Sequence, residues 1–144
     1  MNEEYLFVYG TLRQSLPCSM YGLIEEGTVF AGLGWVAGYL YDIGGYPGMV
    51  QGRARRPRVR GEVYGLRDPR ATLAVVDDYE QCSPRSPTPH EYRRKRLAVT
   101  LDNGGKVRAW CYVYIRPTRG LRLIRGGDYV AYVRHREKGR LRHM

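Results

Sequence analysis

Hydrophobic residues fall into short blocks separated by glycine and proline, a pattern typical of strands joined by turns. The predicted strands are Tyr5 to Tyr9, Thr28 to Leu33, Trp35 to Ile43, Arg60 to Leu66, Tyr92 to Leu101 and Val107 to Ile115. In the last strand two sets of side chains alternate and therefore face opposite sides of a sheet: Ala109, Cys111, Val113 and Ile115 against Trp110, Tyr112 and Tyr114. The main turn clusters are Gly44-Gly45-Tyr46-Pro47-Gly48 and Asp102-Asn103-Gly104-Gly105.

Helices are predicted in three places. A short helix falls between Gln14 and Glu26, and Tyr129 to Arg136 forms a short amphipathic helix. Asp68-Pro69 supplies an N-cap and a first-turn proline for a helix over Arg70 to Glu80. With no internal repeat or domain boundary, residues 1–144 are expected to form one α+β domain with a basic C-terminal segment from about residue 121.

The charge balance is strongly basic. Lys and Arg number 24 against 14 Asp and Glu, which gives a net charge of +10. This excess admits nucleic acid or an anionic substrate as partner. However, the arginines spread from Arg13 to Arg142 without a nucleic-acid-binding motif, so we do not expect nucleic acid as the main partner. Arg53 to Arg60 is interpreted as a solvated edge or hairpin tip. The alternative is a basic nucleic-acid-associated protein in which this cluster and Arg93 to Arg96 make the contacts.

The cysteines and histidines do not indicate a metal site or a disulfide framework. The three cysteines are far apart and odd in number: Cys18, Cys82 and Cys111. The histidines are equally scattered, without a serine–histidine–acid arrangement: His90, His135 and His143. No apolar run approaches the ~20 residues of a membrane span. We therefore expect a cytoplasmic protein that needs no metal or cofactor and does not enter the membrane.

Glu80 is the carboxylate best placed for chemistry. It follows Leu73 and Val76 at helical spacing and lies about 20° from Leu73 around the helix axis, so it shares the core-facing stripe. Burial and the negative end of the helix both raise a carboxyl pKa, which suits a general base near neutral pH. A structural glutamate paired with an arginine remains the alternative. Asp77 and Asp78 are predicted to be solvated.

Two loops can complete a site around Glu80. Tyr9-Gly10-Thr11-Leu12 ends the first strand at a glycine, and such a loop can direct backbone N–H groups at an anion or a carbonyl oxygen. A plain strand-to-loop turn is the alternative. Gln81 to Glu91 contains three prolines and is expected to form a stiff loop that can cover a site. Tyr46 stands in a rigid turn that lines a pocket or covers a sheet end.

Six motifs in order resemble the γ-glutamylcyclotransferase-like superfamily: Val8-Tyr9-Gly10-Thr11-Leu12, Tyr46-Pro47-Gly48, Gly61-Glu62-Val63-Tyr64, Val76-Asp77-Asp78-Tyr79-Glu80, Tyr92-Arg93 and the strand from Tyr112 to Tyr114. The chain departs from the family pattern in Val76-Asp77, where Leu-Asp is usual, and in Gln81, where glycine is common. The segment from Leu121 onward does not align. The resemblance implies a small mixed, barrel-like β-sheet with a few short helices and a pocket at its mouth.

The resemblance also implies an activity. In active relatives the α-amine of a γ-glutamyl group attacks its own γ-carbonyl and releases 5-oxoproline and an amine. Glu80 would then be the general acid and base, and the Tyr9-Gly10-Thr11-Leu12 loop would bind the glutamyl carboxylate or the oxyanion. Tyr46, Tyr92 and Tyr114 would line the pocket. A small-molecule binding module without turnover is the alternative, and the leaving amine and oligomeric state are not read from the sequence.

Overall fold

The hydrophobic blocks form strands, and glycine-rich turns join several of them, in the computed structural model, which describes residues 3–10 and 26–142. The elements run in the order β1 (Tyr5–Val8), β2 (Thr28–Asp42), β3 (Pro47–Gln51), β4 (Arg58–Leu66), α2 (Pro69–Tyr79), β5 (Tyr92–Leu101), β6 (Lys106–Tyr114), β7 (Arg122–Leu123) and α3 (Tyr129–Arg142). The short helix predicted after Gln14 and the loop residues Thr11 and Leu12 fall on residues 11–25, outside the described part of the chain.

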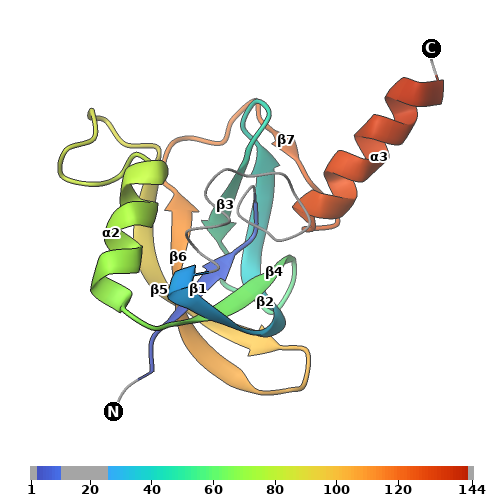
Figure 1. Cartoon of the computed structure of the whole chain (residues 1–144). Coiled ribbons are helices and arrows are strands. Elements are labelled where there is room, and N and C mark those ends of the chain that lie inside the picture. The colour runs from blue at the N-terminus through green and yellow to red at the C-terminus, as the bar shows by residue number, and fades with distance from the viewer. Residues whose placement is uncertain (1–2, 11–25, 143–144) are drawn as a thin grey trace.

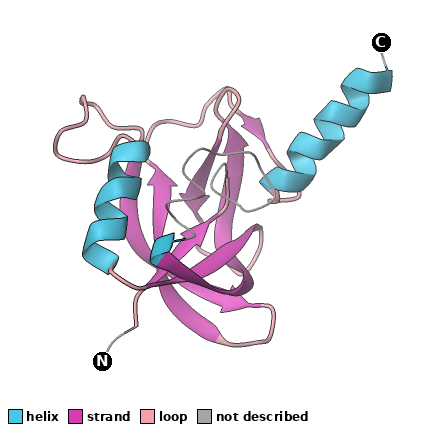
Figure 2. Cartoon of the chain, viewed as in Figure 1, coloured by secondary structure: helices cyan, strands magenta, loops and turns pink. Residues whose placement is uncertain are grey.

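Five strands close into a barrel (Figures 1 and 2). β1 pairs antiparallel with β4, β4 with β2, and β2 with β3. β6 closes the ring because it lies parallel to both β1 and β3. β5 continues the sheet beyond β6 and also pairs with β2. The predicted α+β class with a barrel-like sheet is confirmed.

Alternating side chains of β6 divide the hydrophobic core into two clusters. Ala109, Cys111 and Val113 point into the barrel. Trp110, Tyr112 and Tyr114 point the other way and pack with the buried residues beneath α2. Each fully buried aliphatic side chain stabilises the fold by about 1.5–3 kcal/mol. The predicted alternation is confirmed along the strand, but Ile115 lies beyond its end and is 51% exposed.

β2 is one strand of 15 residues where the sequence predicted two. The predicted break at Gly34 was wrong: a Cβ atom there would lie 2.7 Å from the carbonyl oxygen of Thr100, so glycine permits close approach of β5. The irregularity occurs earlier, where Gly32 has φ +141° and the register with β4 shifts. Gly34 thus permits close packing of two strands, and Gly32 marks a bulge; neither glycine ends the strand.

β3 replaces the second half of a predicted turn. Gly44 and Gly45 turn the chain with positive φ angles, but Pro47 already begins a strand that pairs with β2. Proline is compatible with the first residue of a strand because no ladder hydrogen bond from its nitrogen is needed there. The short β7 was also missed, and α3 extends beyond the predicted Arg136 to Arg142.

The predicted start of α2 is confirmed to within one residue. The Asp68 carboxylate accepts a hydrogen bond from the backbone N–H of Ala71 at 3.2 Å, and Pro69 opens the first turn. Leu73 and Val76 are buried against the sheet. At the other end Glu80 is the C-cap residue, so its side chain is delivered at the point where the helix leaves the sheet.

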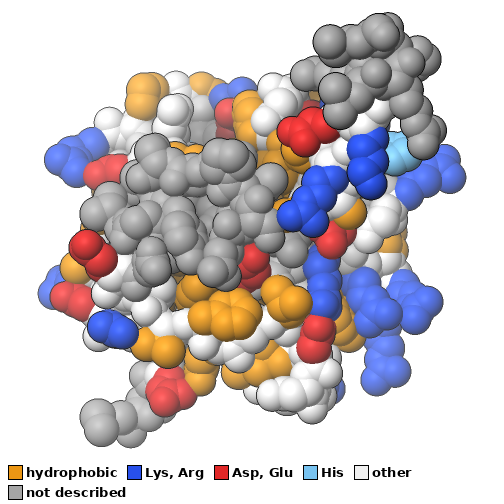
Figure 3. All heavy atoms as spheres, turned by 45° about the vertical axis from the view of Figure 1, so that its right-hand side comes forward, with side chains coloured by type: hydrophobic (Ala, Val, Ile, Leu, Met, Phe, Trp, Pro, Cys, Tyr) orange, Lys and Arg blue, Asp and Glu red, His pale blue; other side chains and the backbone are white. Residues whose placement is uncertain are grey.

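Positive side chains gather along one side of the molecule, toward the right-hand edge of Figure 3. Residues 53–58 are exposed, as expected for a solvated edge, but the last two residues of the predicted arginine-rich run are not: Val59 is buried in β4 and Arg60 forms an ion pair with Asp102. The second arginine cluster is divided, because Arg94 turns inward to an ion pair with Asp77. No helix within residues 3–10 and 26–142 is both long and apolar enough to cross a membrane.

Candidate active site

A cavity opens where α2 ends over the strands of the barrel. Its volume is about 400 Å³ including the open mouth. Its lining comes from the end of β1, the start of β3 and the turn before it, the end of α2, β5 and β6: Phe7, Val8, Tyr9, Gly10, Tyr46, Pro47, Glu80, Tyr92 and Tyr112. Of the residues predicted for the site, Tyr9, Gly10, Tyr46, Glu80 and Tyr92 meet here. We call this space the inner cavity.

Glu80 is the carboxylate in the inner cavity. Its backbone N–H donates to the carbonyl oxygen of Val76 at 2.8 Å, and its side chain is partly buried. Burial raises the pKa of the Glu80 carboxyl to about 7. Among the residues that the structure describes, no Lys or Arg forms an ion pair with it. A group with this pKa can both accept and donate a proton near neutral pH.

Asp77 is not a solvated residue, so that prediction was wrong. Its carboxylate accepts hydrogen bonds from Arg94 Nε at 2.9 Å and from the Tyr112 hydroxyl at 2.6 Å, and its side chain is only 16% exposed. Asp77 follows Leu73 by four positions and lies about 40° from it around the helix, a signal that was available in the sequence. These bonds attach the end of α2, and with it Glu80, to β5 and β6.

The buried tyrosines of the cavity use their hydroxyl groups to hold the backbone. The Tyr9 hydroxyl donates to the carbonyl oxygen of Tyr112 at 2.5 Å and accepts from the N–H of Met49 at 3.1 Å. The Tyr92 hydroxyl donates to the carbonyl oxygen of Pro47 at 2.5 Å. Burial raises the pKa of both hydroxyls, so they stay protonated. Their contribution to the cavity is a rigid wall.

The other two predicted tyrosines lie in different positions. Tyr46 stands at the mouth, 37% exposed, and its hydroxyl donates to both carboxylate oxygens of Glu91 at 3.0 Å. Tyr114 lies behind the wall: its ring packs edge-on against Tyr92 with centroids 5.7 Å apart. Tyr112, which sequence reasoning did not single out, lines the inner cavity. It lies on the same strand face as Tyr114, two residues away.

Gly10 is required by the close approach of two segments. A Cβ atom at this position would lie 2.6 Å from Cγ of Pro47, well inside contact distance. The end of β1 therefore packs directly on the start of β3, and both border the inner cavity. Because Thr11 and Leu12 lie outside the described residues, the anion-binding role of their backbone stays a prediction.

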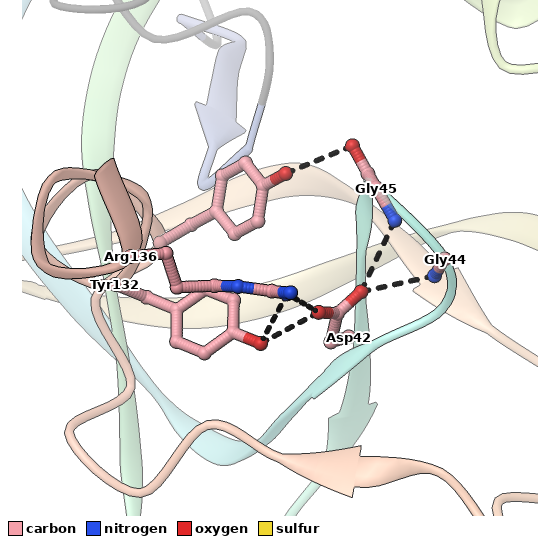
Figure 4. Close-up of polar contacts among 6 residues, drawn as sticks. Asp42, Gly44, Gly45, Tyr132 and Arg136 are labelled. Carbon is pink, nitrogen blue, oxygen red and sulfur yellow. Dashed lines mark hydrogen bonds and ion pairs between the residues drawn. The ribbon is translucent and has the colours of Figure 1, made fainter. Parts of the chain in front are cut away.

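The C-terminal helix holds the turn that carries Tyr46 (Figure 4). Tyr132 and Arg136 bind the Asp42 carboxylate at 2.6 and 2.8 Å. The same carboxylate accepts the backbone N–H groups of the turn glycines, Gly44 at 3.0 Å and Gly45 at 3.2 Å. Although partial burial opposes the effect, the hydrogen bonds from Tyr132 and from the glycines lower the pKa of Asp42.

A further contact comes from the first residue of α3. The Tyr129 hydroxyl donates to the carbonyl oxygen of Gly45 at 3.0 Å, while the ring is buried against the barrel core. The first half of α3 thus fixes both ends of the Asp42-to-Gly45 segment. This role for the C-terminal segment was not predicted from the sequence, because it depends on contacts between residues about 90 positions apart.

A second, larger space adjoins the inner cavity, and we call it the outer cavity. It shares Tyr46, Glu80 and Tyr92 with the inner one. Its other lining residues come from the last residue of α2, the loop after α2 and the segment after β6: Tyr79, Gln81, Pro87, Thr88, Pro89, Glu91 and Arg116. The proline-containing loop predicted after Glu80 therefore lies beside that residue. Within the described ranges, no group of three or more His, Cys, Asp and Glu is arranged to hold a metal ion.

Comparison with known proteins agrees with this arrangement. The family described as "Gamma-glutamyl cyclotransferase, AIG2-like" matches residues 6–131. The chain is 34% identical over 125 residues to the gamma-glutamylcyclotransferase family protein YtfP of Escherichia coli K12, covering 87% of this chain and 95% of that protein. The structure resembles that of an AIG2-like protein from Mus musculus with a TM-score of 0.69 and 25% identity, over 90% of this chain and 89% of that one.

A larger protein contains the same fold. YkqA from Bacillus subtilis aligns with a TM-score of 0.72 over 95% of this chain but only 43% of its own length, and at 21% identity the likeness concerns the fold alone. The family match covers most of the chain, including the strands, the helix and the cavity residues described above. The chain therefore belongs to the AIG2-like γ-glutamyl cyclotransferase family.

Proposed function

We propose that this protein is a γ-glutamyl cyclotransferase that converts a γ-glutamyl amine or amino acid into 5-oxoproline and the free amine. One observation carries the proposal above the others: a carboxylate with its pKa raised to about 7 lines a cavity walled by tyrosines. Ring closure within one substrate requires deprotonation, orientation and stabilisation of an oxyanion, and a single carboxylate near neutral pKa can serve the proton transfers.

The reaction is proposed to begin with Glu80 as a base. Glu80 accepts a proton from the substrate's α-ammonium, and the free amine attacks the γ-carbonyl carbon to form the new C–N bond. Collapse of the tetrahedral intermediate breaks the bond from this carbon to the leaving nitrogen, which receives the proton from Glu80. The attacking nitrogen gives up a second proton as it becomes the ring amide, and the released amine takes up one further proton to become an ammonium ion. Two protons thus pass from the attacking to the leaving nitrogen, atoms and charges balance, and Glu80 is regenerated as the carboxylate.

The remaining site residues orient the substrate in this proposal. Tyr46 and Tyr92 border the acyl group at the shared wall of the two cavities, and Tyr114 supports Tyr92 from behind. The backbone of Tyr9-Gly10-Thr11-Leu12 is assigned to the glutamyl carboxylate or the oxyanion. Backbone N–H groups suit this task because they supply directed positive dipoles without a charged side chain.

The test is release of 5-oxoproline from a panel of γ-glutamyl amino acids, γ-glutamyl-ε-lysine and γ-glutamyl amines. The Glu80→Gln variant should lose about a hundredfold or more of the rate on any active substrate, as expected for a lost general base. Asp78→Asn is the matched control, because Asp78 lies two residues away with its side chain 44% exposed, and it should keep full activity.

Two results would refute the proposal. Substantial turnover by Glu80→Gln would exclude Glu80 as the base. A wild-type protein that releases nothing from the panel, yet binds 5-oxoproline or glutamate, would instead be a small-molecule binding module of the same fold.

A further inference from the structure

We propose that the outer cavity binds the leaving amine and that Arg116 selects leaving groups bearing a carboxylate, an inference that rests on the proposed cyclotransferase function. The inner and outer cavities share one wall. Tyr46, Glu80 and Tyr92 line both cavities, so a substrate that spans them would place its scissile amide beside Glu80. The acid that protonates the leaving nitrogen must lie within hydrogen-bond reach of it.

The two cavities differ in what they can accept. The inner cavity is bounded by the end of β1, the start of β3, and Tyr9 and Tyr92, whose hydroxyls are engaged with the backbone. The outer cavity is larger, about 1180 Å³ including open solvent, and contains ionic and amide side chains. The glutamyl part, which is the same in every substrate, therefore suits the inner cavity. The variable amine suits the outer one.

Among the described residues that line the outer cavity, Arg116 is the single cation. One of its terminal nitrogens donates to the carbonyl oxygen of Pro89 at 2.7 Å, which holds the side chain against the loop. A guanidinium has five N–H donors, so most remain for a ligand, and their planar arrangement matches a carboxylate. The position after β6 thus supplies an anchored group for an anion.

Among the described lining residues, Glu91 carries the remaining charge besides Arg116 and Glu80. Both of its carboxylate oxygens accept the hydroxyl of Tyr46 at 3.0 Å. This contact directs its charge toward the tyrosine at the mouth and holds that ring in place. A ligand carboxylate is therefore expected on the Arg116 side of the outer cavity, where the opposite charge lies.

Gln81 adds a second observation. It is the non-glycine residue with positive φ, +56°, among those the structure describes, and it lines the outer cavity. A left-handed conformation is unfavourable for a residue with a Cβ atom, and such residues cluster at functional sites. Because Gln81 lines the outer cavity and follows Glu80 directly in the chain, we assign its amide to a hydrogen bond with a polar leaving group.

The test compares two substrates that differ by one carboxylate, γ-glutamyl-alanine and γ-glutamyl-ethylamine. The wild-type protein should favour γ-glutamyl-alanine by about fivefold to tenfold in kcat/KM, the range of one partly solvated charged contact. Arg116→Gln should lose that preference by slowing γ-glutamyl-alanine alone, and Arg116→Lys should restore part of it. Arg119→Gln, a nearby exposed arginine, is the control and should match the wild type.

The outcomes separate the two proposals. Equal wild-type rates on both substrates, or an Arg116→Gln variant that slows both equally, would overturn the role of Arg116 while the cyclotransferase function stands. Absence of 5-oxoproline release by the wild-type protein from both of these substrates and from the rest of the panel would overturn the function and this inference with it. Thermal unfolding of each variant confirms that any loss arises in a folded protein.

Discussion

Replacing Glu80 with glutamine should stabilise the fold at neutral and alkaline pH while removing activity. The carboxylate is partly buried, and no described Lys or Arg pairs with it. Ionised Glu80 is therefore less favourable in the folded protein than in the unfolded chain, where it is hydrated. Glutamine has nearly the same shape and carries no charge, so it avoids this penalty.

The size of the effect follows from the pKa of Glu80, which rises from its ordinary 4.5 to about 7 on folding. Each unit of pKa difference between the folded and unfolded states corresponds to about 1.4 kcal/mol of unfolding free energy. The difference of 7 − 4.5 therefore corresponds to a stability penalty of roughly 3 kcal/mol when Glu80 is ionised. Between these values the folded state binds the extra proton, so wild-type stability falls as pH rises through this window and levels off above about 7. Below about 4.5 both states are protonated and the penalty is absent.

The assay is urea unfolding of the wild type and Glu80→Gln at several pH values. The difference in unfolding free energy should be near zero at about pH 4 and grow to roughly 3 kcal/mol in favour of the variant at about pH 8. Asp78→Asn should move in the opposite direction with pH, because hydrogen bonding from Ser83 and the charge of Arg85 lower the pKa of Asp78. A variant that is less stable than the wild type at pH 8, or a difference independent of pH, would refute the reasoning.

Three further substitutions test other parts of the site. Gln81→Gly should raise the unfolding free energy by about 1 kcal/mol, because glycine adopts the left-handed C-terminal position without strain; an unchanged urea midpoint would contradict this. Gly10→Ala should reduce 5-oxoproline release, since the new Cβ atom collides with Pro47 at the cavity. Full activity would show that Pro47 can shift to make room without disturbing the site. Tyr132→Phe removes the hydrogen bond to Asp42 and should lower the unfolding free energy by about 1 kcal/mol. It should also raise KM more than it lowers kcat, and unchanged kinetics would show that α3 does not position the Tyr46 turn for substrate binding.

Local patterns predicted much of the fold because they depend on neighbouring residues. The alternation in β6 and the cap at Asp68 follow from spacing within one element, and both are confirmed. The orientation of Glu80 toward the sheet follows from the helical period in the same way. Six ordered motifs also predicted membership of the γ-glutamyl cyclotransferase family, and this prediction is confirmed.

The errors arose where distant segments decide the outcome. Gly34 separated two predicted strands, but a residue without a side chain is needed there because β5 packs against it. Asp77 was predicted to be solvated, but its carboxylate accepts hydrogen bonds from Arg94 and Tyr112, which lie on strands later in the chain. The contact of α3 with Asp42 could not be read from the sequence, because no local pattern specifies which turn a terminal helix reaches.

The measurement that tests the central claim most directly is the pH dependence of 5-oxoproline release from γ-glutamyl-alanine by the wild type and Glu80→Gln. The account predicts that wild-type kcat/KM rises with pH and bends near 7, where Glu80 ionises, and that the variant shows neither the rate nor this bend. A wild-type profile without a transition near this pH, or a Glu80→Gln protein with the same profile and rate, would contradict the assignment of Glu80 as the general base.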